Sequence, residues 1–224
     1  MGTLPWRLVT VDIDGTLTRG HGWAPIADAF GVRDRFDRTT ERFRARAIDE
    51  DEHLCDLLDL ATGRTVDEVL AVVAATPKLD GIAEGVTELH RGGARVALLS
   101  HNPTYVTAYY RSAFGFDDDE GVEVPLLERG RIGPPSGVHA DKLASLHALL
   151  RRGSASPAEV VHVGDGWADV TLFPYVGGGI AVNTRWPDVA AAADVALVTT
   201  DFRDVVRAVG GLLPRPPTKS TGFL

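Results

Sequence analysis

The 224-residue sequence lacks several features on which membrane-bound and secreted proteins depend. It has a single cysteine, Cys55, which excludes a disulfide within the chain, and the surrounding leucines predict a thiol that packs along a helix. No apolar run is long enough to cross a membrane, and the first residues lead into a predicted strand instead of a signal sequence. We therefore expect a cytoplasmic protein with no membrane partner.

Acidic residues outnumber basic ones, and lysine is scarce. The formal net charge is −8 at pH 7, and no basic stripe offsets it, so nucleic acid is not an expected partner. The lysines are limited to Lys78, Lys142 and Lys219, which makes each of them worth a functional explanation. The histidines show no spacing typical of metal ligands, and we interpret His162, among others, as a packing or surface residue. The sequence indicates no oligomeric state.

What the sequence does contain is a regular alternation of strand and helix patterns, which predicts a doubly wound parallel sheet with helices on both faces, an α/β fold. The acidic residues 117–120 are expected to form a solvated loop, followed by a short β region with a hairpin turn over 121–133. The predicted strands are 7–12, 94–100, 159–165, 179–182 and 194–199, and the predicted helices are 81–93, 103–114, 139–153, 167–176 and 201–209.

One segment interrupts this alternation. Residues 18–80 are mostly helical in pattern and are too long for a simple crossover between two strands. They predict an inserted helical subdomain on an α/β core formed by residues 1–17 and 81–213. The proline-containing residues 214–224 have no apolar periodicity, so we expect a flexible tail.

Polar residues stand at the ends of three predicted strands. Asp12 and Asp14 follow the first strand, Ser100 ends the second, and Asp165 ends a later one, with Asp169 close behind it. Ligand sites of doubly wound sheets lie at the carboxyl ends of the strands, so these residues should converge. Four carboxylates repel a phosphate dianion unless a cation intervenes, and oxygen-only ligands favour a hard ion such as Mg²⁺.

These motifs carry a resemblance to a known family. The segments "DIDGT" (12–16) and "GDGWAD" (164–169), with Ser100 and Lys142 between them, follow the order and spacing of the haloacid dehalogenase (HAD) superfamily of phosphotransferases. Residues 18–80 occupy the place of the helical cap of that superfamily. The chain is most similar to the phosphoserine-phosphatase-like branch, through residues 76–100. The resemblance implies a Rossmann-like core and a phosphatase that acts on a small phosphorylated substrate.

The resemblance also implies roles for individual residues. Asp12 would be the nucleophile that forms an aspartyl-phosphate, and Asp14 the general acid and base. Mg²⁺ would be held by Asp12, Asp165 and the backbone carbonyl of Asp14, and Asp169 would complete the metal environment. The remaining residues of the site would bind the phosphoryl group: Ser100 and Lys142, which match the motifs, and His101 and Asn102, which replace the glycines of that branch.

The substrate is expected to differ from phosphoserine. His21 stands where that branch has a glutamate for the substrate ammonium, and Leu57 where it has an arginine for the carboxylate. His21, Trp23 and Trp167 would instead offer rings to a sugar, nucleotide or specialised-metabolite phosphate. The alternatives that stay open are a phosphoserine phosphatase with a shifted cap alignment, a phosphomutase, and an inactive binding protein with the HAD fold.

Overall fold

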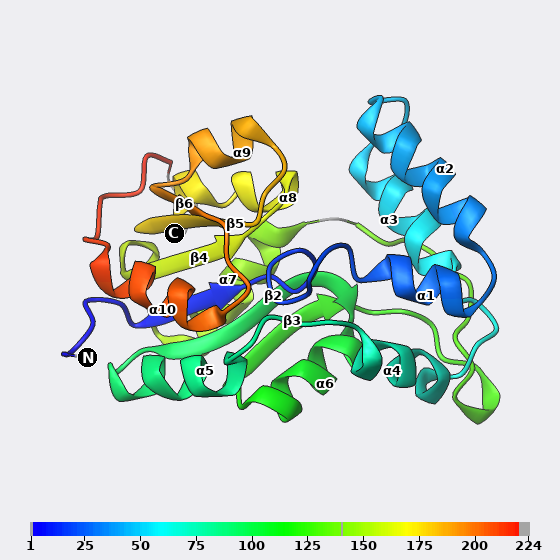
Figure 1. Cartoon of the computed structure of the whole chain (residues 1–224), viewed down its shortest axis with the longest axis horizontal. Coiled ribbons are helices and arrows are strands. Elements are labelled where there is room, and N and C mark those ends of the chain that lie inside the picture. Colours follow the sequence, from blue (N-terminus) through cyan, green and yellow to red (C-terminus); the bar gives the residue numbers. More distant parts are fainter. Residues whose placement is uncertain (1, 140, 220–224) are drawn as a thin grey trace.

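The computed structural model describes residues 2–139 and 141–219, and a parallel sheet lies at its centre (Figure 1). The strand order is β3-β2-β1-β4-β5-β6, and every neighbouring pair is parallel. The predicted parallel α/β fold class is therefore confirmed. The strands are β1 (Leu8–Val11), β2 (Arg95–Pro103), β3 (Asp118–Val122), β4 (Val160–Gly164), β5 (Gly178–Val182) and β6 (Val195–Leu197).

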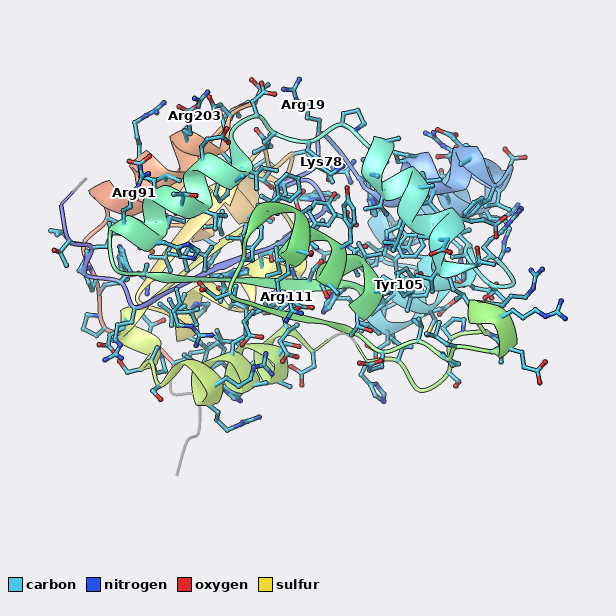
Figure 2. The ribbon with its side chains drawn as sticks, turned by 90° about the horizontal axis from the view of Figure 1, so that it is seen from below. Arg19, Lys78, Arg91, Tyr105, Arg111 and Arg203 are labelled. Carbon is cyan, nitrogen blue, oxygen red and sulfur yellow. The ribbon has the colours of Figure 1, made fainter. Side chains whose placement is uncertain are left out.

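Helices cover both faces of the sheet, because alternate strand residues point in opposite directions. Val9 and Val11 belong to the larger apolar cluster, to which α5 (Ile82–Arg91), α6 (Thr104–Phe114) and α10 (Phe202–Gly211) contribute, whereas Leu8 packs with α7 (Lys142–Gly153). The short helices α8 (Trp167–Val170) and α9 (Pro187–Ala192) lie near β4 and β5. Figure 2 views the molecule from below, with Arg91 and Arg203 on the outer surface of α5 and α10.

The secondary structure of the acidic residues 117–120 differs from the prediction. They were expected to form a loop, but β3 pairs with β2 as the edge strand of the sheet. Asp118 accepts a hydrogen bond from Arg152 at 2.8 Å, and Asp119 lies 3.1 Å from Arg111, so basic residues of the covering helices neutralise this strand. The expected turn follows, since Leu126 and Ile132 form an antiparallel bridge around the 3-10 turn η1 (Glu128–Gly130).

The residues between β1 and α5 form four helices. Local signals explain their starts: the side chain of Asp49 caps α3, and Thr65 and Glu68 form a capping box at α4. The two connections to the core run side by side through an antiparallel bridge between Thr18 and Lys78. Figure 1 shows α1–α3 beyond the carboxyl ends of the strands, with α4 packed near α6. The helices are α1 (Trp23–Ala29), α2 (Arg33–Arg44), α3 (Glu50–Asp59) and α4 (Val66–Ala75).

The final residues contact the core as far as the structure describes them. Arg215 donates a hydrogen bond to Asp194 at 2.7 Å, and the backbone N–H of Lys219 donates to Pro174. The flexibility of residues 214–224 stays a prediction, and residues 220–224 lie outside the described part. Within residues 2–139 and 141–219, no helix has the length and apolar character needed to cross a bilayer.

The central strands should carry much of the stability. Leu98 in β2 is fully buried in the main cluster, so Leu98→Ala should lower the free energy of unfolding by roughly 2–5 kcal/mol through lost burial and the resulting cavity. Val198→Ala is the control, because Val198 is 89% exposed, and a change below about 0.5 kcal/mol is expected there. Urea denaturation measures both, and equal effects would contradict this packing.

Candidate active site

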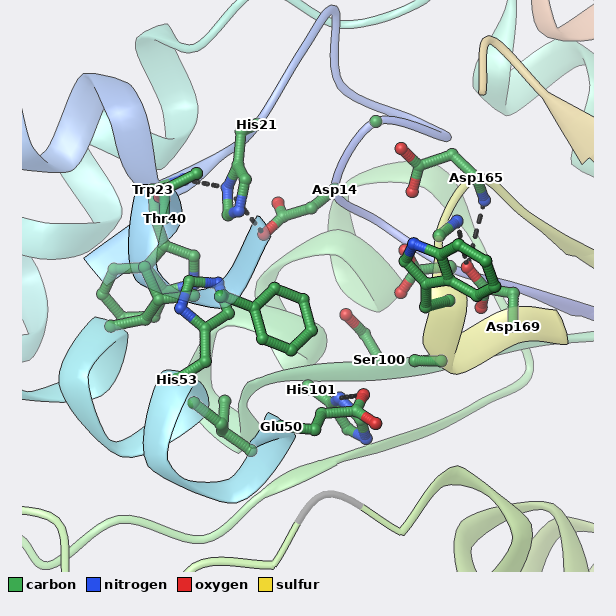
Figure 3. A pocket seen from close by; sticks show the side chains of 18 of the residues that line it. Asp14, His21, Trp23, Thr40, Glu50, His53, Ser100, His101, Asp165 and Asp169 are labelled. Carbon is green, nitrogen blue, oxygen red and sulfur yellow. Dashed lines mark hydrogen bonds and ion pairs between the residues drawn. The ribbon is translucent and has the colours of Figure 1, made fainter. Parts of the chain in front are cut away.

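Residues from three strand ends meet in one cavity of about 310 Å³ (Figure 3). Asp12 follows β1, Asp165 follows β4, and Ser100 lies toward the end of β2. These strands are neighbours, since β1 lies between β2 and β4. The chain runs outward from β1 in both directions along the sheet, so the strand order reverses at this point. Such a switch point is where open α/β sheets bind ligands, and the predicted convergence is what the geometry shows.

A buried lysine joins two of the carboxylates. Lys142, the first residue of α7, places Nζ 2.9 Å from Oδ1 of Asp12 and 2.6 Å from Oδ1 of Asp169. Burial alone would lower the pKa of Lys142, but the charges of the two aspartates raise it above its ordinary value. Lys142 therefore keeps its positive charge beside Asp12.

Asp169 is held at both of its carboxylate oxygens. Oδ1 accepts from Lys142 and from Nε2 of His162, and Oδ2 accepts from the backbone N–H groups of Asp165 and Gly166. Burial raises the pKa of Asp169, but the charge of Lys142 and the hydrogen bond from His162 outweigh it and hold the pKa below its ordinary value. Asp169 is thus a fixed anion that orients Lys142 and the turn carrying Asp165.

His162 is a packing residue, as expected, and it also has polar partners. It is fully buried in β4, with Nδ1 2.9 Å from the hydroxyl of Thr10 and Nε2 bound to Asp169. It is therefore part of the polar network of the site as well as a packing residue. The available sequence signal was a polar residue inside the buried strand pattern 159–165, although nothing there indicated its partner.

Asp12, Asp165 and Asp169 each place one carboxylate oxygen within 4.8 Å of the other two. Burial, together with the neighbouring negative charges, raises the pKa of Asp12 to about 6 and the pKa of Asp165 well above its ordinary value. Lys142 therefore offsets only part of the burial and of the mutual repulsion that act on these carboxylates. A divalent cation with a preference for oxygen would relieve the remaining repulsion, so this donor set fits Mg²⁺. The carboxylate of Asp14 is not part of the cluster.

Two glycines allow the carboxylates to approach the chain this closely. Gly15 has a φ of +76°, and a Cβ at this position would lie 2.2 Å from Oδ2 of Asp165. A Cβ at Gly22 would lie 2.0 Å from Oδ1 of Asp14. Larger residues at either position would displace the carboxylate that faces them.

Asp14 lines the same cavity as Asp12. Its Oδ2 is 3.9 Å from Nδ1 of His21. Burial raises the pKa of Asp14 to about 6, although a hydrogen bond from Asn102 partly opposes the shift. A carboxyl group with this pKa can hold and release a proton near neutral pH, which is what general acid and base catalysis requires.

The other predicted residues line the same cavity. The hydroxyl of Ser100 accepts hydrogen bonds from the backbone and the side-chain amide of Asn102, at 3.3 and 3.1 Å. His101 lies 3.6 Å from the carboxylate of Glu50, and burial lowers its pKa to about 3, so it is neutral. His21, Trp23, Leu57, His101 and Trp167 all contribute to the wall.

Several cavity residues carried no sequence signal. Thr40 and Arg44 come from α2, Glu50 begins α3, and Arg185 follows β5, in segments without a recognisable motif. Other arginines of α2, such as Arg33 and Arg35, form exposed ion pairs, whereas Arg44 lines the cavity.

Comparison with known proteins identifies the family to which the chain belongs. A model of haloacid dehalogenase-like hydrolases matches residues 6–177. The chain belongs to this family. A phosphoserine phosphatase of Archaeoglobus fulgidus is 30% identical over 183 residues, and the chain spans 53% of the length of that relative. A phosphoserine phosphatase of Wolinella succinogenes is 25% identical over 203 residues, which cover 89% of this chain and 98% of the relative.

Solved structures agree on the fold. A phosphoserine phosphatase with an analogue of the phospho-aspartyl intermediate has a TM-score of 0.78 at 20% identity, covering 91% of this chain and 98% of the other. A substrate-bound phosphoserine phosphatase has the same TM-score at 19% identity and the same coverage. The predicted hydrolase family and the similarity to its phosphoserine-phosphatase-like branch are therefore confirmed.

The carboxylate cluster leads to a prediction about metal binding. Mg²⁺ at a hundred times its Kd should stabilise the protein by about 2.7 kcal/mol, which corresponds to several degrees in Tm. Asp165→Asn should raise the Tm of the metal-free protein, because it removes a buried carboxylate that its neighbours repel, and should abolish most of the Mg²⁺-dependent shift. Thermal denaturation with and without Mg²⁺ measures both effects.

The control for this experiment is Asp188→Asn, on the exposed side of α9 and outside the cavity. It should retain the full Mg²⁺-dependent shift. A shift of equal size in Asp165→Asn and in the wild type would show that the ion binds elsewhere.

Proposed function

We propose that this protein is a Mg²⁺-dependent phosphomonoester phosphatase that acts through an aspartyl-phosphate on Asp12. The observation that carries the proposal is the placement of Asp12 at a buried lysine and beside a second carboxyl group of raised pKa, in a chain of a hydrolase family. A nucleophile, a proton donor and a fixed positive charge are the groups that phosphoryl transfer through a covalent intermediate requires.

In the first step, a carboxylate oxygen of Asp12 attacks phosphorus while the bond from phosphorus to the leaving oxygen breaks. Asp14 gives its proton to that oxygen, and the alcohol departs. Lys142 stays charged because Asp12 and Asp169 surround it, so it stabilises the negative charge of the transferring group. Ser100 and Asn102 lie in the same cavity and can donate to phosphoryl oxygens.

In the second step, Asp14 takes a proton from a water molecule, and the water oxygen attacks phosphorus. The bond between phosphorus and Asp12 breaks, which releases inorganic phosphate and restores both carboxyl groups. A Mg²⁺ ion held by Asp12, Asp165 and the backbone carbonyl of Asp14 would supply further positive charge to the phosphoryl oxygens. Asp169 would act by orienting Lys142 and the turn that carries Asp165.

Phosphoserine is the substrate that the comparisons support best, since the curated relatives carry that activity in their names. The sequence argument against it rested on two neutral residues, His21 and Leu57. Both line the cavity, and burial lowers the pKa of His21 to about 4, so neither supplies a charge. However, the cavity also contains Glu50, Arg44 and Arg185, which could meet an ammonium and a carboxylate from other directions.

A second candidate is a phosphomonoester that carries a ring. The observation that favours it is the aromatic wall of the cavity, where the rings of Trp167 and Trp186 lie 6.0 Å apart and Phe43 stacks on His53 at 4.4 Å. Indole and imidazole faces suit a sugar or a base as well as an amino acid. The substrate preference decides between the two candidates.

We further propose that residues 18–80 act as a cap over the site. Supporting this role, α2 and α3 supply Thr40, Arg44 and Glu50 to the cavity, while the core supplies the catalytic carboxylates. Closure of such a cap would exclude water during the first step. A cytoplasmic location is consistent with a small, phosphorylated substrate and remains part of the proposal.

The mechanism predicts unequal effects of two substitutions. Asp12→Asn should abolish Mg²⁺-dependent hydrolysis of p-nitrophenyl phosphate, because the amide cannot form the intermediate. Asp14→Asn should lower kcat by roughly 10²–10⁴-fold for an alkyl phosphate, and by less for p-nitrophenyl phosphate, whose leaving group needs little protonation. Asp188→Asn serves as the control. Full activity of Asp12→Asn, or activity that survives EDTA, contradicts the proposal.

The substrate is tested by phosphate release from a panel that contains phosphoserine, sugar phosphates and nucleotides. The highest kcat/KM is expected with phosphoserine, and a higher value with a ring-bearing compound would favour the second candidate. Formation of an isomer without release of phosphate would identify a phosphomutase. Absence of turnover across the panel would support an inactive binding protein.

A further inference from the structure

Two arginines from distant parts of the chain face the cavity that holds Asp12. Arg44 is the last residue of α2, in the helical insertion, and Arg185 lies in the core between β5 and α9. They are close enough to influence each other, since burial and then the charge of Arg44 lower the pKa of Arg185. Two positive groups therefore converge on the cavity from opposite sides of the predicted cap boundary.

Neither arginine has a carboxylate partner. On the same helix as Arg44, Arg33 pairs with Asp28 and Asp37, and Arg42 pairs with Glu52. In the described part of the chain, by contrast, no carboxylate oxygen lies within 4 Å of the guanidinium of Arg44 or Arg185. The charge of Asp165 offsets the repulsion between the two cations only in part, and an anion placed between them would relieve the rest.

Both arginines are exposed residues whose side chains line the cavity. Arg185 lies over the ring of Trp186, with 5.3 Å from its central carbon to the ring centroid. Arg44 follows Thr40 by one helical turn, so both lie on the face of α2 that lines the cavity. Thr40 is 6% exposed, and its hydroxyl has no hydrogen-bond partner among the described residues. A buried hydroxyl without a partner beside an unpaired arginine points to a ligand at this position.

His21 connects this region to the catalytic groups. Its ring lies 3.9 Å from the carboxylate of Asp14, and its Nδ1 accepts a hydrogen bond from the backbone N–H of Trp23. Arg44 and Arg185 line the same cavity, so a substrate with a second negative group can reach both of them from the catalytic carboxylates.

We infer that Arg44 and Arg185 together bind a second anionic group of the substrate while its phosphoryl group lies on Asp12, with Thr40 as an additional hydrogen-bond donor. This inference rests on the proposed phosphatase function and narrows it to phosphomonoesters that carry a further carboxylate or phosphate. Since Arg44 lies in the insertion and Arg185 in the core, the second anion also links the two parts around the bound substrate.

The test compares substrates that differ by one anion. Phosphoserine is paired with phosphoethanolamine, which lacks the carboxylate, and fructose 1,6-bisphosphate with fructose 6-phosphate, which lacks the second phosphate. The ratio of kcat/KM within each pair measures recognition of that anion. The ratio is that of the two-anion compound to the one-anion compound. In the double variant Arg44→Gln/Arg185→Gln, this ratio should fall roughly 10- to 100-fold for the pair whose second anion the arginines bind, mainly through a higher KM for the two-anion compound.

Arg38→Gln is the matched control, because Arg38 is an exposed arginine of α2 outside this cavity, and its ratios should equal those of the wild type. Unchanged ratios in the double variant for both pairs would overturn the inference. An equal loss with one-anion and two-anion substrates would overturn it as well, because the arginines would then act on the phosphoryl group or on folding.

Calorimetric binding separates this inference from the proposed function. Phosphoserine and phosphoethanolamine are titrated into the protein with Mg²⁺ present, for the wild type and the double variant. If no panel compound is hydrolysed, the proposed function fails, but a preference for phosphoserine that the double variant loses still supports the arginine pair. No preference for the two-anion compound of either pair, in binding or in turnover, would reject it.

Discussion

The site depends on one buried lysine between two aspartates. Lys142 contacts Asp12 and Asp169 with almost no exposure to water, and Asp165 lies in the same cluster. Two unit charges 4 Å apart interact by about 4 kcal/mol at an effective dielectric constant near 20. Without the lysine, the carboxylates would repel one another at that scale. Its position at the start of α7 therefore fixes where the carboxylates of Asp12 and Asp169 can lie close together.

The order of the strands brings these groups together. Because β1 lies between β2 and β4, residues 12, 100 and 165 become neighbours although the chain separates them widely. The sheet is covered on both faces, so its strands are rigid and only their ends are free to carry polar groups. Fine adjustment comes from Gly15, which lets the turn after β1 pass close to Asp165. The close packing of the backbone at the carboxyl ends of the central strands thus sets the positions of these polar groups.

Sequence patterns predicted the features that are encoded within short segments of the chain. The apolar strands, the motifs around Asp12 and Asp165, and the isolated Lys142 could be recognised because each signal lies within a few residues. The edge strand β3 was missed because its acidic residues are acceptable only beside arginines that α6 and α7 supply. The hydrogen bond of His162 to Asp169 and the approach of Arg185 to Arg44 were not predicted for a related reason. Both arise between segments that no spacing rule connects.

The central claim is that Asp12 becomes phosphorylated during turnover. The most direct measurement is to treat the protein with borohydride during hydrolysis of p-nitrophenyl phosphate with Mg²⁺, since borohydride reduces an acyl phosphate to an alcohol, and to map the product by peptide mass spectrometry. The account predicts reduction at Asp12, dependent on substrate and absent from Asp12→Asn. Continued turnover with no reduced residue, or with reduction at a different carboxylate, would contradict it.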